Sequence, residues 1–128
     1  MKYGLAAAAL VCSTPALGTG GFECRPISGP GPRVTVGFGH SAIAVRPFQA
    51  SIGEGKRMLI ANGRPGDPIR IGQSWIDRQY IWLDLVNANS TRFEARIRAT
   101  IQPKYKYPVG IGTLVRNGRT YRVRCIEA

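Results

Sequence analysis

The chain has 128 residues, of which 44% are hydrophobic, a length that suits one domain with a single core and excludes a multidomain protein. Its 16 glycines and 9 prolines are spread along the chain and predict frequent turns in a folded domain rather than a disordered tail. The formal net charge of +11 favours polyanionic partners and disfavours basic ones.

The N-terminus has the pattern of a secretion signal. Lys2 precedes a short apolar run over residues 5–11, and small residues follow the run. Ala16 and Gly18 fit the positions that precede a cut at Thr19, and a cut after Ala16 is the alternative. The run is too short to span a bilayer, so no membrane segment is expected after cleavage. We therefore expect an exported protein, periplasmic or secreted, with a signal peptide over residues 1–18.

The three cysteines bear on compartment and topology. Cys12 lies in the apolar run, where it is expected to behave as a small hydrophobe; a lipid anchor at Cys12 is the less favoured alternative because the residues before it do not match a lipoprotein signal. Cys24 and Cys125 lie near the two ends of residues 19–128. We predict a disulfide between them, which would close almost the whole domain into one loop.

The rest of the chain has the pattern of strands. Residues 19–32 are rich in glycine and proline and predict an irregular arm tied down at Cys24. Beyond the arm, alternation with period two is common, and no stretch keeps helical spacing over three turns. Residues 73–79 predict a single helical turn. Short strands are predicted over residues 33–38, 42–48, 57–61, 68–72 and 80–86.

The clearest strand covers residues 91–102. Successive side chains of a strand point to opposite faces, so one face should be core and the other should carry charge to solvent. The predicted core face holds Phe93, Ala95, Ile97, Ala99 and Ile101, and the charged face holds Arg92, Glu94, Arg96 and Arg98.

Residues 110–125 predict a β-hairpin. Asn117 and Gly118 lie between two strand-like runs, and Asn-Gly suits the type I′ turn, which needs positive φ twice. The two-residue loop pairs Leu114 with Tyr121 and places Arg122 and Arg124 on the face opposite Cys125. Together these elements predict an all-β domain, a small β-sandwich or β-barrel of about seven short, mainly antiparallel strands.

The sequence gives little support for catalysis or for metal binding. His40 is the one histidine, and its neighbour Ser41 would point away from it in extended backbone. With both predicted disulfide cysteines oxidised, no ligand set for a metal remains. The sequence predicts a protein that is not an enzyme and needs no cofactor or metal.

Aromatic residues offer one candidate surface. If Ile81, Leu83 and Leu85 face the core, Tyr80 and Trp82 face solvent and could stack on a sugar or a base. The alternative is that both faces are covered and the rings pack in a core or an interface. A second run, Lys104–Tyr107, interleaves cations with rings in the manner of single-strand nucleic-acid binders, although an exposed turn explains it as well.

The leading hypothesis is a non-enzymatic domain that binds an anionic glycolipid, a glycan or another polyanion of the cell envelope. Arginine suits such ligands because its planar guanidinium binds phosphate and carboxylate through paired donors. The alternative is a protein–protein interaction module, such as an inhibitor or an envelope-complex subunit. The candidate ligand-binding residues are Arg92, Arg96, Arg98, Arg122 and Arg124, with Tyr80 and Trp82 as the stacking surface.

Overall fold

The fold is built entirely from strands in the part of the chain that the structure, a computed structural model, describes: residues 19–40 and 45–127. The predicted signal peptide, Cys12 and Ser41 lie outside these residues. The strands are β1 (Thr19–Pro26), β2 (Arg33–His40), β3 (Val45–Glu54), β4 (Arg57–Ala61), β5 (Ile69–Ile76), β6 (Tyr80–Asn87), β7 (Phe93–Gln102), β8 (Val109–Arg116) and β9 (Arg119–Glu127).

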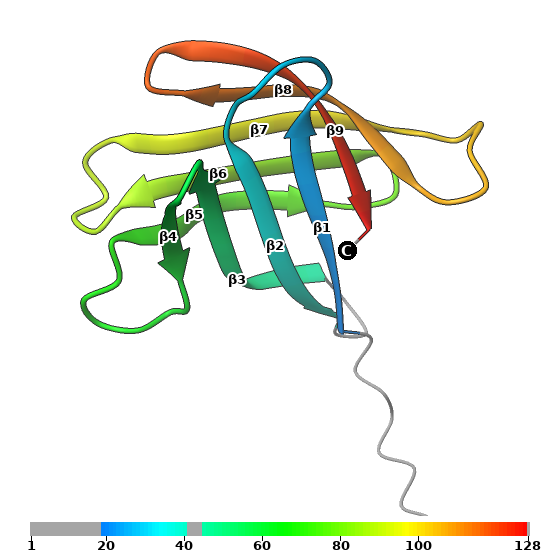
Figure 1. Cartoon of the computed structure of the whole chain (residues 1–128). Coiled ribbons are helices and arrows are strands. Elements are labelled where there is room, and N and C mark those ends of the chain that lie inside the picture. The colour runs from blue at the N-terminus through cyan, green and yellow to red at the C-terminus, as the bar shows by residue number, and fades with distance from the viewer. Residues whose placement is uncertain (1–18, 41–44, 128) are drawn as a thin grey trace, which may run out of the picture.

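All nine strands belong to one sheet, in the order β4-β3-β2-β1-β9-β8-β7-β6-β5, and every neighbouring pair is antiparallel. The sheet curls into a nearly closed barrel, in which β5 to β8 run across the steeper β1 and β2 (Figure 1). Strand direction alternates along the nine strands of the sheet, so the edge strands β4 and β5 run in the same direction. An antiparallel ladder therefore cannot close the barrel between them. Instead, β5 packs against β3 and β4. The all-β prediction is confirmed, and the architecture is barrel-like.

The core lies inside the curled sheet. Alternate residues of each strand point inward, which is why the period-two pattern of the sequence marks the buried positions. Residues Ala95, Ile97 and Ala99 are buried as predicted. The largest fully buried aliphatic side chains come from both halves of the chain: Val34, Val36, Ile52, Ile69, Leu83, Leu85, Ile97, Leu114 and Val123.

The N-terminal arm was predicted wrongly in part. Residues 19–26 form β1, which pairs with β2 on one side and β9 on the other, and only residues 27–32 lie outside strands. The glycines that suggested an arm allow close packing instead, since a Cβ on Gly21 would lie 2.7 Å from the carbonyl oxygen of Val36. Phe22 is buried in the core from this strand.

Two bulges account for two further errors. The predicted helical turn is instead the end of β5 followed by a tight turn, because pairing of Trp75 with Trp82 continues the strand to Ile76. Phe93, predicted in the core, is 56% exposed. It pairs with Val86 after a register shift, and an extra residue in a strand turns the following side chains to the opposite face.

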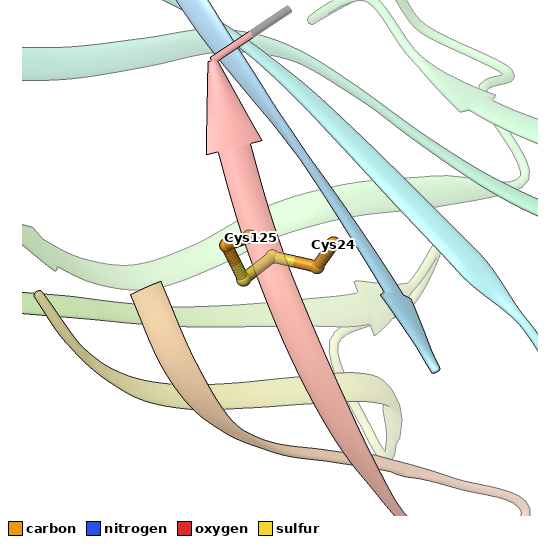
Figure 2. The surroundings of a disulfide bond; sticks show 2 residues. All are labelled: Cys24 and Cys125. Atoms are coloured by element: carbon orange, nitrogen blue, oxygen red, sulfur yellow. A yellow bond between two sulfur atoms is a disulfide. The ribbon is translucent and has the colours of Figure 1, made fainter. Parts of the chain in front are cut away.

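The C-terminal hairpin and the disulfide agree with the predictions. Leu114 pairs with Tyr121, and both turn residues, Asn117 and Gly118, have positive φ. Cys24 lies directly opposite Cys125 across β1 and β9, and the two are joined in a buried disulfide (Figure 2). The bond therefore joins the first strand of the barrel to the last.

Candidate functional site

One exposed row of side chains crosses five neighbouring strands, from β5 to β9. Trp75 of β5 pairs with Trp82 of β6, Trp82 pairs with Arg98 of β7, and Arg98 pairs with Thr113 of β8. Thr113 in turn pairs with Arg122 of β9. Trp82, Arg98 and Arg122 point outward, because chain neighbours such as Leu83, Ile97 and Val123 fill the core, and Trp75 is 61% exposed. Two tryptophans and two arginines thus lie in one line across the outside of the barrel.

A second row runs beside the first. Tyr80 pairs with Thr100, Thr100 with Ile111, and Ile111 with Arg124. On the far side of Arg124 lies Arg25 of β1. Since neighbouring strands lie about 4.8 Å apart, the rings on β5 and β6 and the arginines on β9 are separated by roughly 14–19 Å along the sheet, a span suited to a polymer rather than a single small group. We call the following residues the arginine–aromatic face: Trp75, Tyr80, Trp82, Arg98, Arg122 and Arg124.

The three rings of this face are exposed and close together. The exposed fraction is 61% for Trp75, 37% for Tyr80 and 43% for Trp82. The ring centroids of Tyr80 and Trp82 lie 5.3 Å apart, with the planes inclined by 45°. The guanidinium carbon of Arg98 lies 5.8 Å from the centroid of the Trp82 ring. Because Ile81, Leu83 and Leu85 are buried, the first of the two alternatives holds, and Tyr80 and Trp82 face solvent.

The turn between β5 and β6 is organised by Asp77. Its carboxylate accepts hydrogen bonds of 2.7 Å from the backbone amides of Gln79 and Tyr80, and one of 2.9 Å from Nε1 of Trp75. These bonds, with that from the Gln79 amide the strongest, hold the pKa of Asp77 below its usual range. The same carboxylate thus fixes the turn and orients the Trp75 ring.

A buried carboxylate lies beneath the outer arginines. Asp84 points outward from β6, yet it is only 3% exposed because Arg96 and Arg98 cover it. Arg96 Nε donates to Asp84 Oδ1 over 3.0 Å, and Arg98 Nη1 lies 3.0 Å from the same oxygen. Two cations on one anion leave the cluster with net positive charge, while the ion pairs restrict where the guanidinium groups lie.

The five predicted arginines do not all meet. Arg98, Arg122 and Arg124 share the arginine–aromatic face, whereas Arg96 lies in the next row and its guanidinium carbon is 3.9 Å from the ring centroid of Phe93. Arg92 lies beyond the start of β7 in an ion pair with Glu94. Among the described residues, Arg122 and Arg124 make no ion pair, and both are exposed.

The basic loop between β7 and β8 lies at the same end of the sheet as the turn at Asp77. The amide of Ile101, near the end of β7, donates to the carbonyl of Gln79 over 2.8 Å. Tyr105 and Tyr107 of the loop are exposed, and Lys104 and Lys106 lie over their rings. The loop that carries this second group of rings and cations extends past the strands at this end of the barrel (Figure 1).

Other parts of the described surface carry hollows, one of which is lined by Arg92 and Arg96. One shallow hollow lies over β1 to β3 and another beside Phe93 and Asn117, and both are open to solvent. Residues 19–40 and 45–127 contain no group of three or more His, Cys, Asp and Glu side chains that could hold a metal ion. In the same ranges, no helix has the length and apolar character to cross a membrane.

Comparison of the chain with protein-family models, with curated proteins and with solved structures finds no match. The reading of the site therefore depends on its geometry.

Sequence reasoning missed one member of this face. Trp75 fell in the predicted helical turn, so its position opposite Trp82 was not foreseen. The signal for it was Gly72, since glycine inside a strand pattern marks a bulge. The register shifts between Ile71 and Ser74, and the extra residue turns Trp75 outward.

Proposed function

We propose that the protein is a non-enzymatic binding module that holds an anionic polymer against the arginine–aromatic face. The observation that carries the proposal is the row in which Arg98 and Arg122 continue the line of Trp75 and Trp82, with Arg124 beside it. Arg122 and Arg124 have no ion-pair partner among the described residues, so their donors are available to an anionic ligand.

Shape and charge support a polymeric ligand. The face is spread across five strands rather than gathered in an enclosed pocket, and enclosed pockets are typical of small ligands. The net charge of +11 adds a long-range attraction that raises the rate of encounter with any polyanion. The expected affinity therefore depends strongly on ionic strength.

The disulfide supports an exported location, which is part of the proposal. Buried structural disulfides persist in oxidising compartments such as the periplasm and the extracellular space. The polyanions of such a compartment include acidic glycans and the phosphates of envelope glycolipids. These are the ligands that we propose for the face.

The test is a salt titration of binding to heparin, to lipopolysaccharide and to anionic vesicles. The variant Arg122→Gln/Arg124→Gln removes the free charges of the face, and Lys56→Gln/Arg57→Gln removes equal charge from the turn between β3 and β4. We expect the first variant to bind at least about tenfold more weakly, since two charge-assisted contacts are lost, and the second to bind nearly as wild type. Binding that is absent, insensitive to salt, or equally weakened by both variants would contradict the proposal.

The second candidate function is a protein–protein interaction module. It is favoured by the edge strands β4 and β5, each paired on one side only, and by the exposed Met58 and Ile60 on β4. In this case a partner cross-linked in the native envelope should contact β4 and β5. Its binding should be insensitive to the Arg122→Gln/Arg124→Gln change.

A further inference from the structure

We propose that Trp75, Tyr80 and Trp82 form a stacking platform for a sugar ring with an acidic substituent, and that Arg98 binds that substituent. The inference rests on the proposed function, and it narrows the polyanion to an acidic polysaccharide. Charge alone would let any polyanion bind, whereas a ring platform selects polymers that have rings to stack. The observation behind it is the juxtaposition of three exposed rings with one oriented guanidinium.

The rings form an exposed patch. The stability of the fold alone does not explain why they are exposed. Exposed clusters of large apolar side chains are uncommon in monomers and mark surfaces that contact something else. Here Trp75 and Trp82 are direct cross-strand neighbours, and Tyr80 packs against Trp82 with centroids 5.3 Å apart. The carbon-bound hydrogens of a pyranose form an apolar face, which packs on such rings while the hydroxyl groups remain in water.

The platform is held in place before any ligand arrives. The Trp75 indole donates to Asp77, and the amide of Tyr80 donates to the same carboxylate. The carbonyl of Gln79 is in turn bound by the amide of Ile101, which ties the turn to β7. Because the rings lose little freedom on binding, more of the contact energy remains as affinity.

Arg98 is oriented in a similar way. Its Nη1 donates to the carbonyl of Ile97 over 2.8 Å and pairs with the buried Asp84. Nε and Nη2 of the same guanidinium make no hydrogen bond within the described part of the chain. Since Arg96 binds the same oxygen of Asp84, the charge of Arg98 is only partly neutralised. It can therefore still donate to an anion above the sheet.

The position of Arg98 favours a sugar acid over a nucleic acid. Its guanidinium carbon lies over the Trp82 ring, 5.8 Å from the ring centroid. A carboxylate or sulfate attached directly to a sugar ring that stacks on the platform stays close to this guanidinium. In a nucleotide the whole sugar separates the base from its phosphate, so a stacked base would leave its charge farther from Arg98.

The chain provides its own probe for the experiment. Its two tryptophans are Trp75 and Trp82, so tryptophan fluorescence, excited where tyrosine does not absorb, reports on the platform alone. We would measure fluorescence and calorimetric affinity with polygalacturonate, dextran sulfate, neutral dextran, polyphosphate and a single-stranded oligonucleotide. Polygalacturonate and dextran sulfate distinguish a carboxylate from a sulfate substituent, and polyphosphate is an anion without rings.

The variants are Trp82→Ala, Tyr80→Ala and, as a matched control, Phe48→Ala, which removes an exposed ring from β3 on another part of the barrel. The two platform variants should weaken binding of the acidic polysaccharides about tenfold and leave polyphosphate binding within about twofold, since only stacking is lost. Phe48→Ala should change neither. Either platform variant is sufficient if the other fails to fold.

Arg98→Lys tests the guanidinium. It keeps the charge and removes the planar pair of donors, so it should weaken the binding of polygalacturonate more than the binding of polyphosphate. Equal affinity for polyphosphate and the polysaccharides, unchanged by Trp82→Ala, would overturn the platform and leave the proposed function standing. If the oligonucleotide binds more tightly than polyphosphate and the polysaccharides, and Trp82→Ala abolishes that binding, the platform stacks a nucleic-acid base and the proposal of a sugar ligand is wrong. No binding to any polyanion would overturn both proposals.

Discussion

The two halves of the barrel share one interior and differ on the outside. Strands β1 to β4 and strands β5 to β9 both send alternate aliphatic side chains into the core. On the outside, the first half presents a hollow of small and polar residues and the scattered apolar side chains of Phe48, Met58 and Ile60, whereas the second half presents the arginine–aromatic face. The shallow hollow over the first half is lined by Gly20, Gly21, Thr35, Gly37, Gln49, Ala50 and Ser51. Since packing constrains only the inner residues, the outer difference points to function.

Besides the packing of β5 against β3 and β4, two sets of bonds join these halves, and we call them the two seams. At one, β1 and β9 form a ladder that includes the disulfide. At the other, Arg116 at the end of β8 donates to Glu54 at the end of β3 over 2.7 Å and to Glu94 of β7 over 2.9 Å. Because the ladder between β4 and β5 is missing, these seams are expected to carry much of the coupling between the halves.

The largest effect is expected from Cys24→Ala/Cys125→Ala, which breaks the first seam. The bond joins residues 101 positions apart, and in the chain-entropy model closing such a loop stabilises the folded state by about 4–5 kcal/mol. Denaturant unfolding should show a loss approaching that value, measured as the free energy of unfolding.

Polyanion binding is the control for this variant. At a temperature where the variant is still folded, binding should survive, since no cysteine belongs to the arginine–aromatic face. A loss below about 1 kcal/mol, or a folded variant that no longer binds, would show that the bond does not act as a structural clasp.

Arg116→Ala, which opens the second seam, should have an intermediate effect. The Arg116 side chain is 11% exposed and the Glu94 side chain 12%, so the change takes one of two cations from a mostly buried carboxylate, which keeps only the more exposed Arg92. We expect the free energy of unfolding to fall by about 2–3 kcal/mol, as for a hydrogen bond to a charged group whose partner stays buried.

Arg119→Ala is the matched control, since Arg119 is exposed and makes no ion pair among the described residues. It should change stability by less than about 0.5 kcal/mol. If both variants melt alike, the second seam contributes little.

The smallest effect concerns pH and the turn at Asp77. The folded-state pKa of this carboxyl is lowered, so its contribution to stability is fully present above the unfolded pKa and is lost as pH falls through the folded pKa. In a Trp82→Phe background, Trp75 emission should change as pH falls from about 5 to about 2. Asp77→Asn should flatten that change, and identical profiles would remove Asp77 as the group that orients the Trp75 ring.

Local patterns were predictable because they depend on neighbours in the chain. The register of the last hairpin followed from Asn117–Gly118, since few residue pairs accept positive φ twice. The inward side of β7 followed from alternation, apart from Phe93. The error at Phe93 and the missed Trp75 have one cause, because a bulge shifts the face of every later residue and depends on the partner strand.

By itself, the sequence determined an all-β domain and the Cys24–Cys125 pairing, because alternation and turn chemistry are local, and it made the outward position of Tyr80 and Trp82 depend on which face of their strand is core. Only the tertiary structure decided that Arg98 and Arg122 align with Trp82 while Arg92 lies apart, and that Gly20 and Gly21 belong to a strand. Strand order and register bring residues far apart in the chain side by side, and no local pattern encodes the partner of a strand.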